Sequence, residues 1–136
     1  MGKERDIFIS YSSKNLEVAE DIREYLEQNG FSWWMAPYCI AGGNDYAEEI
    51  MDGISVCKVF LLVLTEEAQL SPYVRRELEC AINYNKVIVS IHMDKSAIQK
   101  AYQYHLSVNQ IIDANNRKLV AYREMLETIE ALAGVK

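Results

Sequence analysis

VFLLVLTEEAQLSPYVRRELECAIN, residues 59–83, has the pattern of a buried strand that leads into a helix. Residues 59–64 are the most apolar run in the chain and predict the central strand of a sheet, covered on both faces. Ser71 followed by Pro72 is typical of a helix start, because serine caps free N–H groups and proline already has a helical φ. Apolar residues then recur at helical spacing, which predicts a helix over residues 71–83 with one face toward a core.

Tyr73 and Glu77 lie four residues apart and therefore share one edge of this predicted helix. An aromatic ring beside a carboxylate can hold a flat ligand and stabilise a developing positive charge. The ordinary alternative is a rim tyrosine and a solvated helix glutamate, since most helix glutamates face water. Spacing alone leaves both interpretations open.

Outward from this stretch, strands and helices alternate along the chain. The predicted strands are residues 6–11, 31–35, 59–64, 87–91 and 108–113. The other predicted helices are one that ends at a glycine cap after residue 28, one over 45–56 and one over 119–132, with 65–70 a linker and 92–106 irregular or weakly helical. This alternation predicts an α/β fold with a parallel sheet and helices on both of its faces.

Length and composition predict one domain over residues 1–136, with a core of about 6–132. Half of the residues are hydrophobic, which is enough to build a sizeable core. The net charge of −6 argues against nucleic acid as a main partner, because phosphate binding needs a clustered basic surface. No apolar run is long enough to span a membrane, so we expect no membrane segment.

The cysteines and histidines exclude further chemistry. Cys39, Cys57 and Cys80 are odd in number and lack C-x-x-C spacing, so we expect reduced cysteines in a cytoplasmic protein. The chain has two histidines, His92 and His105, which are few ligands for a metal site. We therefore predict no metal site.

Polar and aromatic residues follow the first two predicted strands, at the sheet edge where α/β proteins bind ligands. Ser10, Tyr11 and Ser12 either cap the following turn or contact the sugar or phosphate of a ligand. Trp33 and Trp34 alternate along a strand, so one is expected in the core while the other can reach a pocket.

Three blocks of sequence resemble the Toll/interleukin-1 receptor (TIR) domain, of the bacterial type. DIFISYSSKN (6–15) is similar to the family's opening strand and the loop after it. GFSWWMAPYCIAGGNDYAEEI (30–50) resembles the second strand and the BB loop, with its tryptophan, one residue, then Ala-Pro. VFLLVLTEEAQLSPYVRREL (59–78) is similar to the central strand and the helix with an aromatic-x-x-x-Glu motif. The three occur in the family's order, and the likeness runs from about residue 6 to residue 113, which is most of the chain.

The resemblance implies a flavodoxin-like three-layer fold and one of two functions. Many members split NAD between nicotinamide and ribose with the motif's glutamate, which is Glu77 here. NAD is then the substrate, with no separate cofactor, and the products are nicotinamide and ADP-ribose or a cyclic ADP-ribose. The candidate substrate-binding residues are Ser10, Tyr11, Ser12, Trp34, Ala36, Pro37, Asp45 and Tyr73. Asp45 has an alternative role as the N-cap of the next helix.

The second function implied is that of a scaffold that binds other TIR domains and performs no chemistry. Self-association is expected in either case, since catalysis in the family also requires it. The setting implied for the enzyme is intracellular signalling or anti-phage defence.

Two departures from the family pattern bear on activity. Tyr73 stands where the motif usually has tryptophan, which can shift the balance between hydrolysis and cyclisation. Tyr38 and Cys39 stand where bacterial relatives often have an Arg-Asp pair in the loop.

Two other families with this fold fit less well. A response-regulator receiver needs an acidic pair after its first strand and an aspartate at the end of the third, and both are missing here. A nucleoside deoxyribosyltransferase also uses a glutamate, but the Trp-x-Ala-Pro loop favours the TIR domain.

Overall fold

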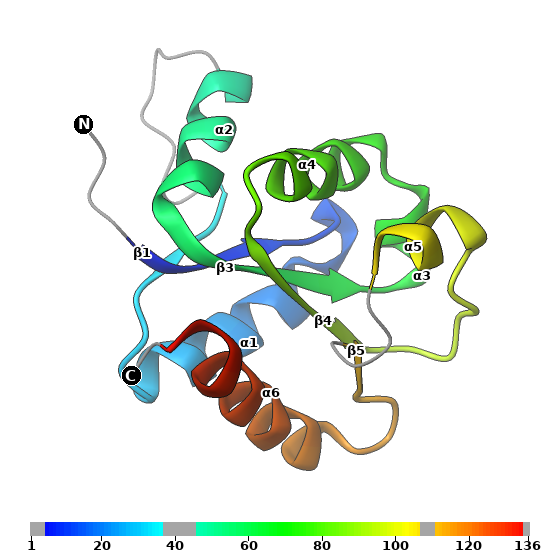
Figure 1. Cartoon of the computed structure of the whole chain (residues 1–136). Coiled ribbons are helices and arrows are strands. Elements are labelled where there is room, and N and C mark those ends of the chain that lie inside the picture. The colour runs from blue at the N-terminus through cyan, green and yellow to red at the C-terminus, as the bar shows by residue number, and fades with distance from the viewer. Residues whose placement is uncertain (1–4, 37–45, 107–110, 135–136) are drawn as a thin grey trace.

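The centre of the molecule is a five-stranded parallel sheet with the strand order β2-β1-β3-β4-β5 (Figure 1). The computed structural model describes residues 5–36, 46–106 and 111–134. The strands are β1 (Arg5–Ser10), β2 (Trp33–Trp34), β3 (Cys57–Leu64), β4 (Val87–His92) and β5 (Ile111–Asp113). This order is that of the flavodoxin-like fold, whose topological switch point lies between β1 and β3. The predicted fold class is confirmed.

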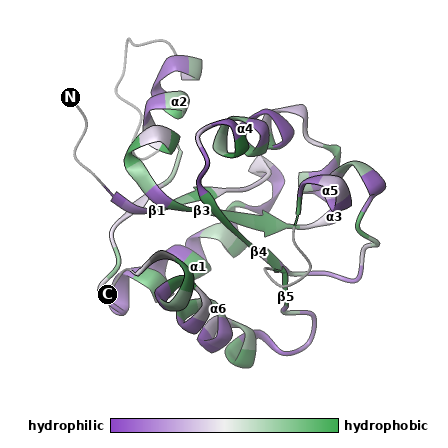
Figure 2. Ribbon diagram, in the orientation of Figure 1, coloured by the Kyte–Doolittle hydropathy of each residue, from purple (hydrophilic) through white to green (hydrophobic). Residues whose placement is uncertain are grey.

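Helices cover both faces of the sheet and make the fold three-layered (Figure 1). One face packs against α1 (Leu16–Gln28) and α6 (Lys118–Ala133). The other face packs against α2 (Tyr46–Val56), α3 (Glu66–Leu70), α4 (Pro72–Asn83) and α5 (Lys100–His105). Figure 2 shows hydrophobic residues concentrated in β3 and β4, while the helices carry both kinds of residue, as expected for elements with one buried face.

The alternation of side chains along β1 decides which residues reach each layer. Ile7 and Ile9 belong to the core beneath α1 and α6, and Phe8 belongs to the core beneath α2 and α4. Because successive side chains of a strand point to opposite faces, Ser10 is on the same side as Phe8. The last residue of β1 therefore lies below the α2–α4 layer.

A stack of aromatic rings crosses the sheet beneath α2. Phe8 stacks on Trp34 with ring centroids 4.8 Å apart, and on Phe60 with centroids 5.5 Å apart. Gly53 lets α2 approach this stack, since a Cβ atom there would lie 2.5 Å from Cε2 of Trp34. Glycine lowers helix propensity by about 1 kcal/mol relative to alanine, but packing requires it at this position of α2.

Two predicted elements differ from the observed ones. β2 is shorter than the predicted strand over 31–35, because the Phe31 N–H is used to close the end of α1 by donating to the Leu26 carbonyl, 3.1 Å away. Residues 66–70, predicted as part of a linker, form the helix α3. Thr65 caps α3 by accepting a hydrogen bond from the Ala68 N–H at 3.0 Å, and two glutamates occupy the first turn.

The other boundaries agree with the predictions to within two residues where the chain is described. Gly30 has a φ of 89° and supplies the predicted left-handed cap after α1. Residues 108–110 of the fifth predicted strand lie outside the described residues, as do Pro37 and Asp45. Within the described ranges, no helix has both the length and the apolar character of a membrane span.

Candidate active site

The helix α4 carries the two residues of the aromatic-x-x-x-Glu motif. It begins as predicted, with Ser71 accepting a hydrogen bond from the Val74 N–H at 3.2 Å and Pro72 in the first turn. Its buried stripe of Val74, Leu78 and Ala81 packs on the sheet. This packing places Tyr73 and Glu77 along the edge of the helix that faces the carboxyl ends of the strands.

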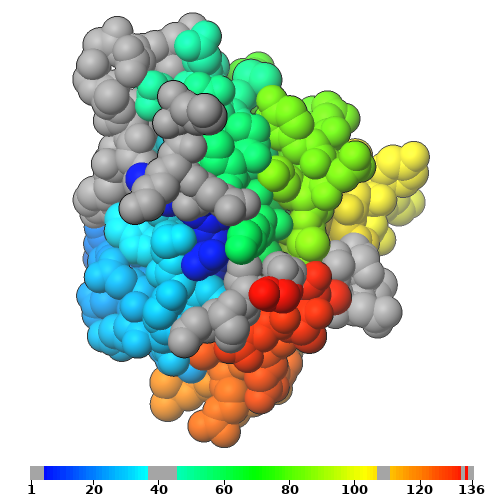
Figure 3. Space-filling view, turned by 60° about the vertical axis from the view of Figure 1, so that its left-hand side comes forward, coloured from blue at the N-terminus to red at the C-terminus, as the bar shows by residue number. Residues whose placement is uncertain are grey.

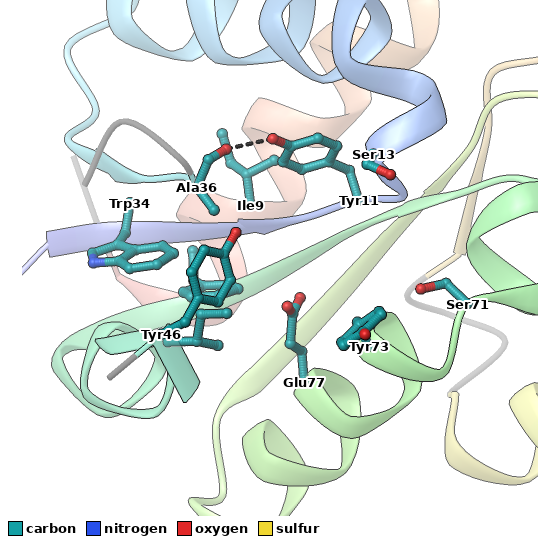
Figure 4. A pocket seen from close by; sticks show the side chains of 11 residues that line it. Ile9, Tyr11, Ser13, Trp34, Ala36, Tyr46, Ser71, Tyr73 and Glu77 are labelled. Carbon is teal, nitrogen blue, oxygen red and sulfur yellow. Dashed lines mark hydrogen bonds between the residues drawn. The ribbon is translucent and has the colours of Figure 1, made fainter. Parts of the chain in front are cut away.

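Glu77 lines a pocket of about 410 Å³ at this sheet edge (Figure 4). The pocket lies beside the switch point, between β1, the end of β2, α2 and α4. Figure 4 shows the Glu77 side chain between Tyr46 and Tyr73, with its carboxyl group directed toward β1. The lining residues are Phe8, Ile9, Tyr11, Ser13, Trp34, Ala36, Tyr46, Ile50, Ser71, Tyr73 and Glu77.

The structure brings together five of the residues predicted for the site. Tyr11, Trp34, Ala36, Tyr73 and Glu77 all line this pocket. Their predicted roles in substrate binding and catalysis stay predictions, as do those of Pro37 and Asp45, which lie outside the described residues.

Ser10 and Ser12 are not among the residues that line the pocket. Ser12 is buried and its hydroxyl caps the short helix η1 (Ser13–Asn15) by accepting from the Lys14 N–H at 3.2 Å. The capping interpretation of Ser12 is thus confirmed. Ser10 is only 1% exposed, and its hydroxyl donates a hydrogen bond to Oε1 of Glu77 at 2.7 Å.

The two tryptophans separate as alternation requires, but their roles are not divided as predicted. Trp34 both packs in the core and lines the pocket. Trp33 lies on the other side of the sheet, where its indole N–H donates to Glu27 and Arg23 lies over its ring. One residue therefore serves core and pocket together, because the pocket floor is the edge of the aromatic stack.

Several lining residues were not predicted as part of the site. Tyr46 is the first residue of α2, directly after the predicted Asp45, so its position gave a signal. The sequence predicts only a capping role for Ser71, whose side chain caps α4 and also borders the pocket. Phe8, Ile9 and Ile50 look like ordinary core residues in the sequence, and only the fold places them at the pocket.

Burial raises the pKa of Glu77 to about 7, from an ordinary value of 4.5. The Ser10 hydrogen bond opposes this rise, because it favours the charged form. Glu77 is half-buried as a residue, and its carboxyl group lies deep enough for burial to dominate. A carboxyl group poised near neutral pH in a pocket is typical of a functional site.

Tyr11 links the first strand to the start of the loop that follows β2. Its hydroxyl donates a hydrogen bond to the Ala36 carbonyl (Figure 4). Burial, with the nearby Tyr46, Glu20 and Glu77, raises the pKa of Tyr11 to about 12, which keeps the hydroxyl protonated as a donor. The contact holds the pocket wall at the point where the chain leaves the sheet.

A second hollow, of about 750 Å³, lies between α2 and α4. Figure 3 shows the two helices next to each other above β1. The second hollow shares Tyr46, Ile50, Tyr73 and Glu77 with the first, so Glu77 borders both. Its remaining lining is mostly apolar, with Arg76 and Glu79 among the charged residues.

The described residues contain no group of three or more His, Cys, Asp or Glu side chains that could hold a metal ion.

The sequence model of the TIR domain matches residues 7–128, which is most of the chain. The chain belongs to the TIR domain family. The matched range includes the three blocks of resemblance except for Asp6, and it includes the whole aromatic-x-x-x-Glu segment from Tyr73 to Glu77. A comparison with curated protein sequences found no match.

Solved structures share the TIR fold at low identity. The TIR domain of the Toll-related receptor TRR-2 from Hydra magnipapillata matches with a TM-score of 0.79 and 19% identity, over 93% of this chain and 98% of that one. The TIR domain heterodimer of RPS4 and RRS1 matches with a TM-score of 0.68 and 16% identity, over 97% and 100%. A TIR-STING receptor from C. gigas, solved with 2′,3′-cGAMP, matches with a TM-score of 0.68 and 19% identity, over 95% of this chain and 39% of that chain.

Proposed function

We propose that this TIR domain is an NAD glycohydrolase, with Glu77 as its catalytic residue. The observation that carries the proposal is the placement of Glu77: a deeply set carboxyl group with a pKa raised to about 7 faces a pocket at the switch point of the sheet. The NAD-cleaving branch of the family, which the sequence resembles, uses the glutamate at this position. We further propose that this TIR domain is of the bacterial type and that it acts in the cytoplasm, in signalling or anti-phage defence.

The chemistry requires no general acid. The bond between C1′ of the ribose and the nicotinamide nitrogen breaks, and its electron pair stays with nicotinamide, which leaves as a neutral molecule. C1′ becomes oxocarbenium-like, and the Glu77 carboxylate stabilises this charge or attacks the carbon. Water then adds to C1′ and releases a proton, which yields ADP-ribose, or another group of the same molecule attacks and yields a cyclic product.

The two hollows give a dinucleotide room on either side of Glu77. Their volumes of about 410 Å³ and about 750 Å³ are in the usual range for small-molecule sites. We propose that the scissile bond lies at their junction, beside Glu77 and the ring of Tyr73. Tyr73 is 70% exposed, and the Arg76 guanidinium lies over its ring, 5.9 Å from the centroid. We propose that the exposed ring stacks on a flat group of the substrate.

The test is nicotinamide release from NAD by the purified wild type and by Glu77→Gln. The matched control is Glu24→Gln, because Glu24 is exposed on α1, across the sheet from the pocket, and the substitution changes the same charge. Each protein is assayed in dilute solution and clustered on beads, so that a requirement for self-association is met.

We expect release by the wild type and by Glu24→Gln, and a loss of at least about a hundredfold in Glu77→Gln, the usual minimum for a catalytic group. Chromatography of the second product then separates hydrolysis from cyclisation. Absence of release by the clustered wild type would overturn the proposal.

A non-catalytic scaffold is the second candidate function. It is favoured by the RPS4–RRS1 structure, in which two TIR domains pair, and by exposed aromatic residues such as Tyr46, which is 57% exposed. In that case Glu77→Gln would leave partner binding unchanged, and the partners would be other TIR domains.

A further inference from the structure

The hydrogen bond between Ser10 and Glu77 joins the end of β1 to the second turn of α4. The two residues are 67 positions apart in the sequence, and their side-chain oxygens are 2.7 Å apart. Ser10 is the last residue of β1 and pairs with Leu62 of β3 in the parallel register, so its backbone is held in the middle of the sheet. The hydroxyl is therefore presented to Glu77 from a rigid support.

The position of Ser10 is unusual for a hydroxyl group. The residues around it on this face of the sheet, Phe8, Phe60 and Leu62, are buried and apolar. A hydroxyl in such a place is unfavourable unless it is hydrogen-bonded. Here the Ser10 hydroxyl donates a hydrogen bond to the carboxyl group of Glu77.

Other charged or titratable groups lie near Glu77 on the elements that surround it. They are Tyr11 after β1, Tyr46 on α2, Tyr73, Arg76, Glu79 and Cys80 on α4, Tyr84 after α4, and Tyr102 on α5. Burial raises the pKa values of Tyr11, Cys80 and Tyr102, and the negative charge of Glu77 adds to each rise. For Glu77 itself, burial raises the pKa and the Ser10 hydroxyl lowers it.

We propose that Ser10 is the positioning residue of the site: its hydroxyl orients the Glu77 carboxyl group in the pocket and favours the charged form that the reaction needs. The catalytic part of this assignment rests on the proposed function, whereas the effect of Ser10 on Glu77 does not. Ser10 thus acts through Glu77 and does not need to touch the substrate.

The experiment is a pH titration of the Glu77 carboxyl carbon by NMR in protein labelled with 13C-glutamate. The Glu77 signal is assigned by its loss in Glu77→Gln. Wild type is compared with Ser10→Ala and with the control Ser90→Ala. Ser90 is equally buried, at 1% exposure, lies on β4 of the same sheet, and has a hydroxyl with no hydrogen-bond partner among the described residues.

We expect Glu77 to titrate at higher pH in Ser10→Ala than in the wild type, and at an unchanged pH in Ser90→Ala. In the NAD assay at neutral pH, kcat of Ser10→Ala falls by about tenfold or more, which is the effect expected from the loss of one hydrogen bond to a charged group. KM changes little, and the acidic limb of the pH profile moves to higher pH.

An unchanged Glu77 titration in Ser10→Ala would overturn the proposal. If Ser10→Ala does not fold, Ser10→Cys provides the same test, because its thiol fills the space but is a weak donor. The titration needs no turnover, so it tests the effect of Ser10 on Glu77 even if the wild type does not cleave NAD. Absence of NAD cleavage would overturn the proposed function and the catalytic part of this assignment.

Discussion

At the scale of single residues, burial of Glu77 links its charge to the stability of the fold. Because burial raises its pKa from 4.5 to about 7, the folded chain keeps this proton over a pH range in which the unfolded chain has lost it. The free energy of unfolding therefore falls as pH rises through that range, by an amount on the order of 3 kcal/mol. The loss is complete above about pH 7.

Glu77→Gln removes this dependence, since glutamine does not titrate. We expect the variant to gain stability relative to the wild type as pH rises from about 5 to about 8. Urea unfolding at both pH values measures this difference, and Glu24→Gln should follow the wild type. A difference between Glu77→Gln and wild type that is the same at both pH values would show that Glu77 is not held in an environment that disfavours its charge.

At the scale of the elements, α2 depends on a glycine for its packing against β2. Replacing a helical glycine with alanine normally stabilises a helix by about 1 kcal/mol. In Gly53→Ala the new Cβ atom would lie 2.5 Å from the Trp34 indole, so either α2 or the ring must move. We expect a destabilisation of about 1–3 kcal/mol, the usual cost of overpacking.

The same change should weaken NAD cleavage, because Trp34, which makes this contact, and Ile50, which lies on the same helix as Gly53, both line the pocket. Thermal unfolding and the nicotinamide assay measure the two effects. Asp52→Ala is the control, since Asp52 is the exposed preceding residue of the same helix. Stabilisation by Gly53→Ala would show that α2 does not pack closely on Trp34.

Elements with a strong pattern could be predicted from the sequence, and those decided by their neighbours could not. The apolar run of β3 and the Ser-Pro start of α4 are local signals, and both elements were predicted nearly to their ends. β2 is short because it is an edge strand with β1 as its neighbour and because Phe31 is used by the end of α1. α3 is only five residues long, too short for hydrophobic periodicity to show.

At the scale of the whole molecule, the topology assembles a site that local patterns only outline. Tyr73 and Glu77 could be predicted as a pair because they share one helix. The contact of Ser10 with Glu77 depends on β1 lying beneath α4, which follows from the strand order and from the side on which Phe8 and Ser10 face. The sequence indicated Ser10 as a candidate but not its partner, since hydrogen bonds over 67 residues leave no local signal.

The net charge of −6 bears on the proposed self-association of this TIR domain. Copies with the same charge repel one another, and salt screens this repulsion, with a Debye length of about 30 Å at 0.01 M and about 8 Å at 0.15 M. Sedimentation velocity should therefore show larger species as NaCl rises from about 10 to about 150 mM. If cleavage requires assembly, nicotinamide release per molecule rises over the same range. Dissociation with added salt would instead show that patches of opposite charge hold the copies together. Nicotinamide release that is independent of both salt and protein concentration would show that one copy completes the site.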